Sequence, residues 1–129
     1  MKKLIFILLA ALLLTACAQE KDNDREAIYM NITAQEAKEI MDTQEGYIIL
    51  DTRTQEEYDE GHIPGAIVIP HDEITDRAEE ELPHKDQLLL VYCRSGRRSK
   101  LAAEALVKLG YTNIKEFGGI LDYDGELEV

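Results

Sequence analysis

Positive charge and cysteine are both scarce in this sequence, and each shortage excludes a class of protein. The chain has 14 lysines and arginines against 26 aspartates and glutamates, a formal net charge of −12 at pH 7. An acidic protein of this kind repels nucleic acids and anionic lipid surfaces, so neither is an expected partner. Its two cysteines are Cys17 and Cys93. Since His71 and His84 have no metal-ligand spacing with each other or with Cys93, neither a metal nor another cofactor is expected.

Long apolar runs are also lacking, because the longest, at the N-terminus, is too short to span a bilayer comfortably. Two lysines precede eleven apolar residues at 4–14, as in a secretory signal peptide. The sequence "LTAC" at 14–17 resembles the lipobox of bacterial lipoproteins, in which cleavage leaves the cysteine N-terminal and lipid-modified. The alternative is an ordinary signal peptide cleaved at a neighbouring alanine, with Cys17 incidental.

These features divide the chain into three parts. We predict a signal peptide over residues 1–16, a polar tether over residues 17–28 and one folded domain over residues 29–126. The expected product is secreted across the cytoplasmic membrane and held in the cell envelope by lipid on Cys17. Cys93 is then the one free thiol of the mature chain, in a compartment that favours disulfides. Such a thiol is either buried and inert or has a chemical function.

Apolar runs and capping signals alternate along the domain, as in an α/β protein. Strands are expected over 27–32, 47–51, 66–70, 88–93 and 113–117, and helices over 33–41, 54–61, 73–82 and from about 97 to Gly110. The first two helices begin with a threonine three residues before a glutamate, the spacing of a capping box. The strands at 47–51 and 88–93 are apolar enough for burial on both faces. We therefore predict a central, mostly parallel sheet with helices on both faces.

The main concentration of positive charge surrounds Cys93. In "VYCRSGRRSK", residues 91–100, a strand ends at the cysteine and four basic residues follow without an intervening acid. Gly96 allows the loop to curl, and the N-terminus of the next helix directs free N–H groups back toward the sulfur. Such surroundings bind anions and lower the pKa of a thiol from about 8.5 by one to several units. The alternative is a buried, inert cysteine beside solvated basic residues.

Three motifs in order are similar to those of rhodanese-type sulfurtransferases. The sequence "CRSGRRS" at 93–99 resembles the active-site loop of that family, "DTRTQEEYDEGHIPGAIVIP" at 51–70 its second hallmark, and "FGGI" at 117–120 the segment that closes the domain. The resemblance covers about residues 30–124. It implies the rhodanese α/β fold and a ping-pong reaction. In that reaction Cys93 takes a sulfane sulfur from an anionic donor such as thiosulfate and passes it to cyanide or a thiol.

The resemblance also implies roles for the residues of the loop. Cys93 would be catalytic, and the residues that would hold the donor and the persulfide are Arg94, Ser95, Gly96, Arg97, Arg98 and Ser99. Arg94 and Arg98 are the first candidates for contact with the donor anion. Ser99 is expected to cap the helix, in preference to donating a hydrogen bond to the sulfur. A phosphatase of the same fold would need an arginine where Ser99 stands, so that activity is not expected.

Other family positions are expected to serve the structure. Asp51 and Arg53 can border the pocket, and we expect a structural charge pair rather than contact with substrate. His62 is expected to stabilise a turn by a hydrogen bond rather than to act as a base. Tyr123 stands where related proteins often have tryptophan, which is a tolerable aromatic exchange.

Two other functions stay open at this point. One is a non-catalytic interaction module of the same fold, against which the intact Cys93 and the glycine-containing basic loop argue. The other is a redox sensor based on a single cysteine, which the absence of a resolving cysteine weakens.

Overall fold

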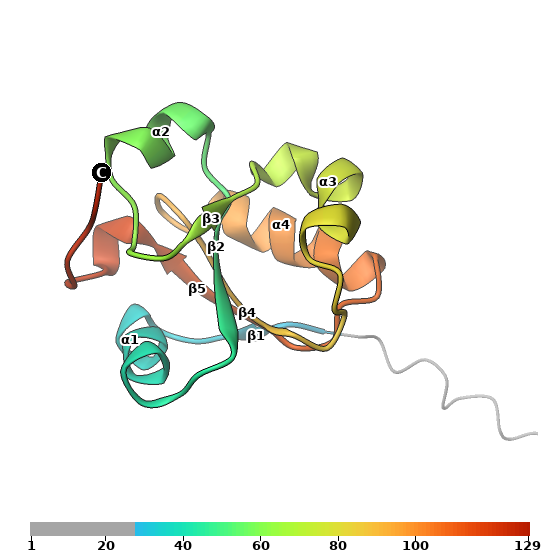
Figure 1. Cartoon of the computed structure of the whole chain (residues 1–129), viewed down its shortest axis with the longest axis horizontal. Helices are drawn as coiled ribbons and strands as arrows, with labels where there is room; N and C mark the ends of the chain where they lie inside the picture. The colour runs from blue at the N-terminus through green and yellow to red at the C-terminus, as the bar shows by residue number, and fades with distance from the viewer. Residues whose placement is uncertain (1–27) are drawn as a thin grey trace, which may run out of the picture.

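A five-stranded parallel sheet organises the protein, in a computed structural model that describes residues 28–129 (Figure 1). The strand order is β1-β5-β4-β2-β3, and each neighbouring pair is parallel. The strands are β1 (Met30–Asn31), β2 (Tyr47–Asp51), β3 (Ile67–Val68), β4 (Leu88–Cys93) and β5 (Ile114–Gly119). The predicted α/β class with a parallel central sheet is confirmed. The predicted signal peptide, the lipobox with Cys17 and the tether up to residue 27 lie outside the described residues.

Four α-helices connect these strands. They are α1 (Ala34–Thr43), α2 (Gln55–Glu60), α3 (Ile74–Glu81) and α4 (Arg97–Lys108), with short 3-10 turns η2 (His71–Glu73) and η3 (Ile120–Asp122). The capping boxes predicted from Thr33 and Thr54 are both present, each threonine exchanging hydrogen bonds with the glutamate three residues on. In residues 28–129, no helix combines the length and the apolar character that crossing a bilayer requires.

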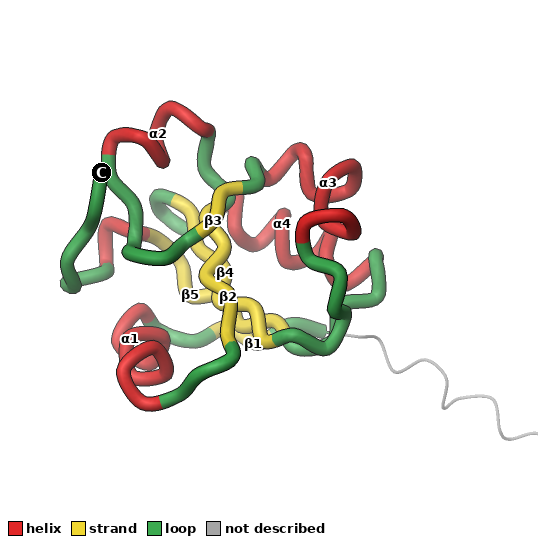
Figure 2. Tube along the Cα trace, viewed as in Figure 1, coloured by secondary structure: helices red, strands yellow, loops and turns green. Residues whose placement is uncertain are grey.

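Helices cover both faces of the sheet, as predicted. Figure 2 shows α1 on one side and α3 with α4 on the other. The α3–α4 side packs on alternate residues of β4, Leu89 and Val91, and the α1 side packs on Leu90 and Tyr92. Successive side chains of β4 therefore pack on opposite faces of the sheet, and both faces are buried.

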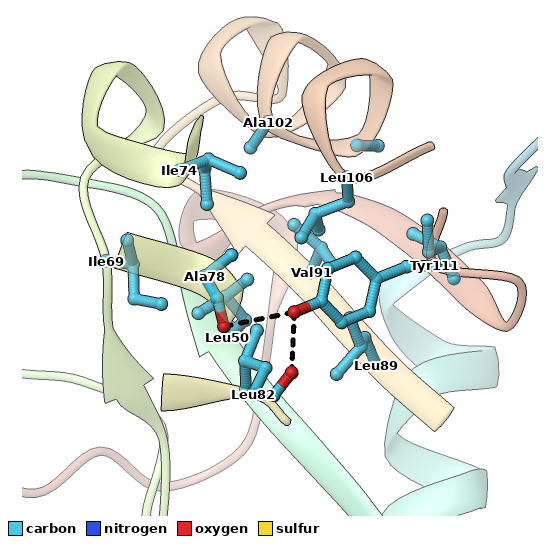
Figure 3. Packing of buried hydrophobic residues seen from close by; sticks show 12 residues of the cluster. Leu50, Ile69, Ile74, Ala78, Leu82, Leu89, Val91, Ala102, Leu106 and Tyr111 are labelled. Atoms are coloured by element: carbon cyan, nitrogen blue, oxygen red, sulfur yellow. Dashed lines mark hydrogen bonds between the residues drawn. The ribbon is translucent and has the colours of Figure 1, made fainter. Parts of the chain in front are cut away.

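A polar anchor fixes the end of α3 within the larger apolar cluster (Figure 3). The hydroxyl of buried Tyr111 lies 3.0 Å from the carbonyl oxygen of Ala78 and 2.5 Å from that of Leu82. Because these carbonyls belong to the last turn of α3 and its C-cap, the tyrosine supplies a donor that the end of the helix lacks. This contact holds α3 on the face that α4 also covers.

The parallel arrangement places the carboxyl ends of β2, β4 and β5 at one edge of the sheet. In register, Asp51 of β2 faces Tyr92 of β4, and Cys93 pairs with Gly119 of β5 after an irregularity that follows Val91. Ligands of open α/β sheets bind outside this edge. The edge therefore brings the Asp-x-Arg segment, the cysteine loop and the Gly-Gly segment together from three separate parts of the sequence.

Two of the strands are shorter than predicted. The strand expected over 66–70 is regular at Ile67–Val68 alone, and of the described residues 28–32 in the strand expected over 27–32, Met30–Asn31 are regular. Both lie at edges of the sheet, where a strand has one neighbour with which to form a ladder. Beyond Val68 the contact with the β2 segment continues irregularly, because Ile69 and His71, on either side of Pro70, donate to the carbonyl oxygens of Asp51 and Thr52 at 3.0 Å each.

Candidate active site

The sulfur of Cys93 is enclosed by the loop that joins β4 to α4. Cys93 is 1% exposed, and the backbone N–H of Gly96 donates to its Sγ at 3.0 Å. Gly96 has a φ of +115° and forms the N-cap of α4. This backbone conformation favours glycine, and it turns the amide of residue 96 toward the sulfur. The predicted curl of the loop and the predicted start of the helix at Arg97 are both present.

Burial and hydrogen bonding act on the Cys93 thiol in opposite directions. Burial, the largest single influence, disfavours the charged form and alone would raise the pKa. Against it act hydrogen bonds from the Ser99 hydroxyl and from the backbone amides of Ser99, Gly96 and Ser95. Together these outweigh burial, so the pKa of Cys93 lies below its ordinary value. The thiolate is the nucleophilic form, so the loop prepares Cys93 for nucleophilic attack.

Ser99 does not cap the helix, and that prediction is wrong. The N-cap is Gly96, which places Ser99 in the first turn of α4 with its side chain turned inward and fully buried. Its Oγ lies 3.4 Å from Sγ of Cys93 and 2.5 Å from Oε2 of Glu116. Its side chain does contact the sulfur, but Sγ of Cys93 donates to Ser99 Oγ, because the single hydroxyl hydrogen of Ser99 goes to Glu116.

The arginines of the loop differ in what they contact. Arg98 forms a two-point pair with Glu57 of α2, at 2.7 Å from Nη1 to Oε1 and 3.0 Å from Nη2 to Oε2. Its guanidinium is thus already engaged by a carboxylate. Arg94 and Arg97 are exposed at the edge of the loop. For a dianionic donor, these two arginines are the exposed guanidinium groups next to Cys93.

Asp51 and Arg53 form the predicted charge pair. Nη2 of Arg53 lies 2.7 Å from Oδ2 of Asp51, and Nε contacts both carboxylate oxygens at 3.0 and 3.1 Å. Both side chains are buried, and the Tyr92 hydroxyl donates to the same Oδ2 at 2.8 Å. The Arg53 side chain also reaches the carbonyl of Gly61 at 2.7 Å, so the pair ties β2 to the end of α2. Whether these residues border the pocket stays a prediction.

His62 stabilises its turn, as predicted. Its Nδ1 lies 2.8 Å from the carbonyl oxygen of Tyr58, and its ring stacks on the Tyr58 ring at 3.7 Å between centroids. Its backbone pairs with that of Glu128, so the C-terminal segment returns beside α2, where Figure 1 places the end of the chain. The ring and the backbone of His62 therefore make structural contacts and do not serve Cys93.

Sequence reasoning missed three residues of this site. Glu116 is 2% exposed and contacts Ser99, and the available signal is an acid in the predicted strand "NIKEF", two residues after Ile114 and so on the same face. The capping-box spacing predicts a capping role for Glu57, but nothing in the sequence pairs it with Arg98. Gly119 allows β5 to approach the loop, because a Cβ there would lie 1.9 Å from the carbonyl oxygen of Arg94. Its signal was the second glycine of "FGGI".

A cavity of about 560 Å³ opens beside the loop. Ser95 and Lys100 line it from the loop and α4, Glu116 and Gly118 from β5, and residues 31–35 from the start of α1. Among residues 28–129, no group of three or more histidine, cysteine, aspartate or glutamate side chains is arranged to hold a metal ion. The site described here is therefore a thiol held by amides, with basic side chains at its edge.

A cysteine held by loop amides at the carboxyl edge of a five-stranded parallel sheet defines a rhodanese-type domain. The chain belongs to the rhodanese-like domain family, whose sequence pattern matches residues 33–125. Thiosulfate sulfurtransferase PspE of Escherichia coli (strain K12) is 40% identical over 73 residues, covering 57% of this chain and 70% of PspE. The putative sulfur carrier protein YrkF of Bacillus subtilis (strain 168) is 36% identical over 110 residues, covering 84% of this chain and 58% of YrkF.

A solved structure agrees with this assignment. The rhodanese-like domain from the Alr3790 protein of Anabaena sp. superposes with a TM-score of 0.71 and 27% identity, covering 76% of this chain and 77% of that one. The rhodanese fold that the three motifs implied is therefore confirmed. The relatives of the chain include a sulfurtransferase, and Cys93 is buried in the matching domain. Sulfur transfer is therefore the chemistry to consider.

Proposed function

We propose that this protein is a sulfurtransferase that moves a sulfane sulfur from an anionic donor such as thiosulfate to cyanide or a thiol, through a persulfide on Cys93. The observation that carries the proposal is the Cys93 sulfur, which accepts a hydrogen bond from the Gly96 amide at 3.0 Å and whose thiol has a lowered pKa. The 40% identity to a thiosulfate sulfurtransferase supports the class of donor.

In the first half-reaction, the Cys93 thiolate attacks the outer sulfur of thiosulfate. The S–S bond of the donor breaks, its electron pair leaves with sulfite, and a persulfide forms on Cys93 without any external oxidant. The amides that donate to the resting sulfur can then hold the charge of the outer sulfur, because they converge on this point. Arg94 and Arg97 at the edge of the loop attract the dianion over the distance that screening allows, about 8–10 Å.

In the second half-reaction, a nucleophilic acceptor removes the outer sulfur. Cyanide or a thiolate attacks that sulfur, the persulfide S–S bond breaks, and its electron pair returns to Cys93 as thiolate. The products are thiocyanate or an acceptor persulfide, and the enzyme regains its starting state. Donor and acceptor therefore react in turn at the same sulfur, which predicts ping-pong kinetics.

Thiocyanate production from thiosulfate and cyanide tests this function. The wild-type chain is expected to give parallel double-reciprocal plots, and Cys93→Ser no turnover, with little loss of stability because the substitution nearly preserves volume. Turnover retained in Cys93→Ser would contradict the proposal. A chain that gains oxygen on Cys93 under oxidants but no sulfur from donors would instead be a redox sensor. A chain that binds partners without turnover would be an interaction module.

We also propose that the protein works outside the cytoplasmic membrane, anchored by lipid on Cys17. The support is the sequence alone, with two lysines, the apolar run at 4–14 and "LTAC" at 14–17. A membrane partner is thus proposed for the lipid, whereas the acidic body of the protein disfavours anionic surfaces.

A further inference from the structure

Glu116 is a buried carboxylate directly behind the catalytic loop. It lies in β5 with 2% of its surface exposed, and its Oε2 accepts hydrogen bonds from Ser99 Oγ at 2.5 Å and from the Gly118 amide at 2.9 Å. Its other oxygen lies 4.0 Å from the ammonium group of Lys100. Two hydrogen bonds to one carboxylate oxygen therefore fix this buried side chain against the loop.

The Ser99 hydroxyl connects this carboxylate to the sulfur. Its oxygen lies 3.4 Å from Sγ of Cys93, and carbonyl oxygens of Gly96 and Gly118 lie at 3.0 and 3.2 Å. A hydroxyl has one hydrogen to donate and two lone pairs that accept. Because a hydrogen bond to a carboxylate is stronger than one to a carbonyl, the resting direction is thiol to Ser99 and Ser99 to Glu116.

We propose that Glu116 is a positioning residue that takes up the proton of Cys93 through Ser99 and so generates the nucleophilic thiolate. The proposal rests on the proposed function of Cys93 and names a residue that it did not use. The proton on Sγ moves to Ser99 Oγ as the Ser99 proton moves to Oε2 of Glu116. The reversed hydroxyl then donates to the thiolate, and the new carboxylic acid donates to the hydroxyl.

This transfer leaves the total charge of the site unchanged. One negative charge moves from Glu116 to Cys93, so no net charge is created in a region from which water is excluded. The neutral Glu116 also removes a repelling carboxylate as a dianionic donor approaches. Burial raises the pKa of the Cys93 thiol, but hydrogen bonds, first among them that of the Ser99 hydroxyl, bring it below its ordinary value, in agreement with a thiolate that accepts from Ser99.

Other charged and titratable groups face this relay from the neighbouring elements. Lys100 of α4 lies 4.0 Å from Glu116, and Arg98 of α4 favours the thiolate of Cys93. Tyr29, next to β1, has a pKa raised by burial first and by Glu104 and Glu116 after it. Asp122 lines the same cavity as Glu116 and adds negative charge on that side. Lys100, Arg98, Tyr29 and Asp122 are unchanged in the variants below, so they do not alter the comparison.

The test is the rate at which iodoacetamide alkylates Cys93 in the full chain between pH 5 and 9. Glu116→Gln keeps the shape of the side chain but cannot accept a proton, so the thiolate should form at higher pH. We expect alkylation at pH 6 to slow about tenfold, which corresponds to one pKa unit. Alkylation that is equally fast or faster would overturn the proposal, because Glu116 would then only repel the thiolate.

Two further variants exclude a merely structural effect. Ser99→Ala interrupts the relay and should move the pH profile in the same direction, and adding Glu116→Gln to it should cause no further slowing. Independent, additive losses would overturn the relay. Glu104→Gln removes an equal charge from an exposed position of α4 and should leave the profile in place. Circular dichroism verifies that each variant folds. If Glu116→Gln does not fold, the shift of the alkylation pH profile in Ser99→Ala decides whether the relay exists.

This measurement is separate from the test of the proposed function. Alkylation needs no sulfur donor, so the relay can fail while thiosulfate still transfers sulfur to Cys93. Conversely, a chain with no transfer activity would still show the Glu116-dependent profile if the relay exists.

Discussion

At the scale of single residues, hydrogen-bond donors of the loop determine the state of Cys93 more than the arginine charges do. Gly96 donates to the sulfur at 3.0 Å, and the favourable influences on the pKa of Cys93 come first from Ser99 and the loop amides. Arg98, an obvious candidate from the sequence, is paired with Glu57. We therefore propose that the arginines exposed to solvent, Arg94 and Arg97, serve donor binding rather than thiol activation.

Arg94→Ala should weaken the binding of thiosulfate while the chemical step continues. We expect the KM for thiosulfate to rise about three- to tenfold with kcat nearly unchanged, and more at low salt, since screening already weakens exposed charges at high salt. Steady-state kinetics at two ionic strengths measures this. Lys108→Ala, which removes the same charge at the exposed far end of α4, is the control. An unchanged KM in Arg94→Ala would mean that the amides alone bind the donor.

At the scale of elements, Glu57 joins the start of α2 to the start of α4. Its carboxylate accepts from the Thr54 amide in the capping box and pairs with Arg98 across the site. The hydrogen bond from Arg98, foremost, and those from Thr54 lower the pKa of Glu57 from 4.5 to about 2 against the opposing effect of burial. The pair therefore holds the catalytic loop against α2 as long as Glu57 is charged.

The stability that this pair supplies should depend on pH. Because the folded-state pKa of Glu57 is depressed, the contribution is full above pH 4.5 and is lost as pH falls toward 2. Glu57→Gln should lower the free energy of unfolding by about 2 kcal/mol at pH 7, and the difference from wild type should shrink at pH 3. Urea unfolding at both pH values measures it. A difference that does not change with pH would contradict the assignment.

The contact between β5 and the loop depends on Gly119. Its φ of −138° is ordinary extended backbone, but a Cβ would lie 1.9 Å from the Arg94 carbonyl oxygen and 2.6 Å from the Ser95 amide. Gly119→Ala must therefore displace the loop. We expect a loss of about 1–3 kcal/mol in unfolding free energy and a clear fall in sulfur transfer.

Gly125→Ala is the matched control for that substitution. Its Cβ would meet the side chain of Tyr123 at 2.5 Å, which is a half-buried ring that can move aside. Thermal unfolding and thiocyanate production of both variants make the comparison. If Gly119→Ala were no more damaging than Gly125→Ala, close packing of β5 on the loop would not be required for activity.

At the scale of the whole molecule, the sheet and its order of elements follow from the sequence, whereas contacts between distant side chains do not. The strands β2 and β4 have the predicted bounds, since continuous apolar runs define them. The Arg98–Glu57 pair joins residues 41 positions apart, which the folded sheet brings together by placing the starts of α2 and α4 at the same edge. For the same reason, the sequence predicts that Ser99 caps a helix, whereas its side chain contacts Glu116 of β5.

The proposed anchor is a property of the whole chain and can be tested in a bacterial host. Cys17→Ser should abolish lipid modification and leave an unprocessed or unlipidated precursor, whereas the wild-type chain should carry a mass increase on its N-terminal cysteine and sediment with membranes. Mass spectrometry of the N-terminal peptide and fractionation measure this. A wild-type protein that is cleaved elsewhere, with Cys17 unmodified or removed, would contradict the anchor.

The intact mass of the purified full chain, before and after incubation with thiosulfate, tests the central claim most directly. The account predicts a gain of about one sulfur atom on Cys93, removed by cyanide and absent in Cys93→Ser, as covalent catalysis by a persulfide requires. A chain that gains no sulfur, while Cys93 remains free and reacts with iodoacetamide, would contradict it.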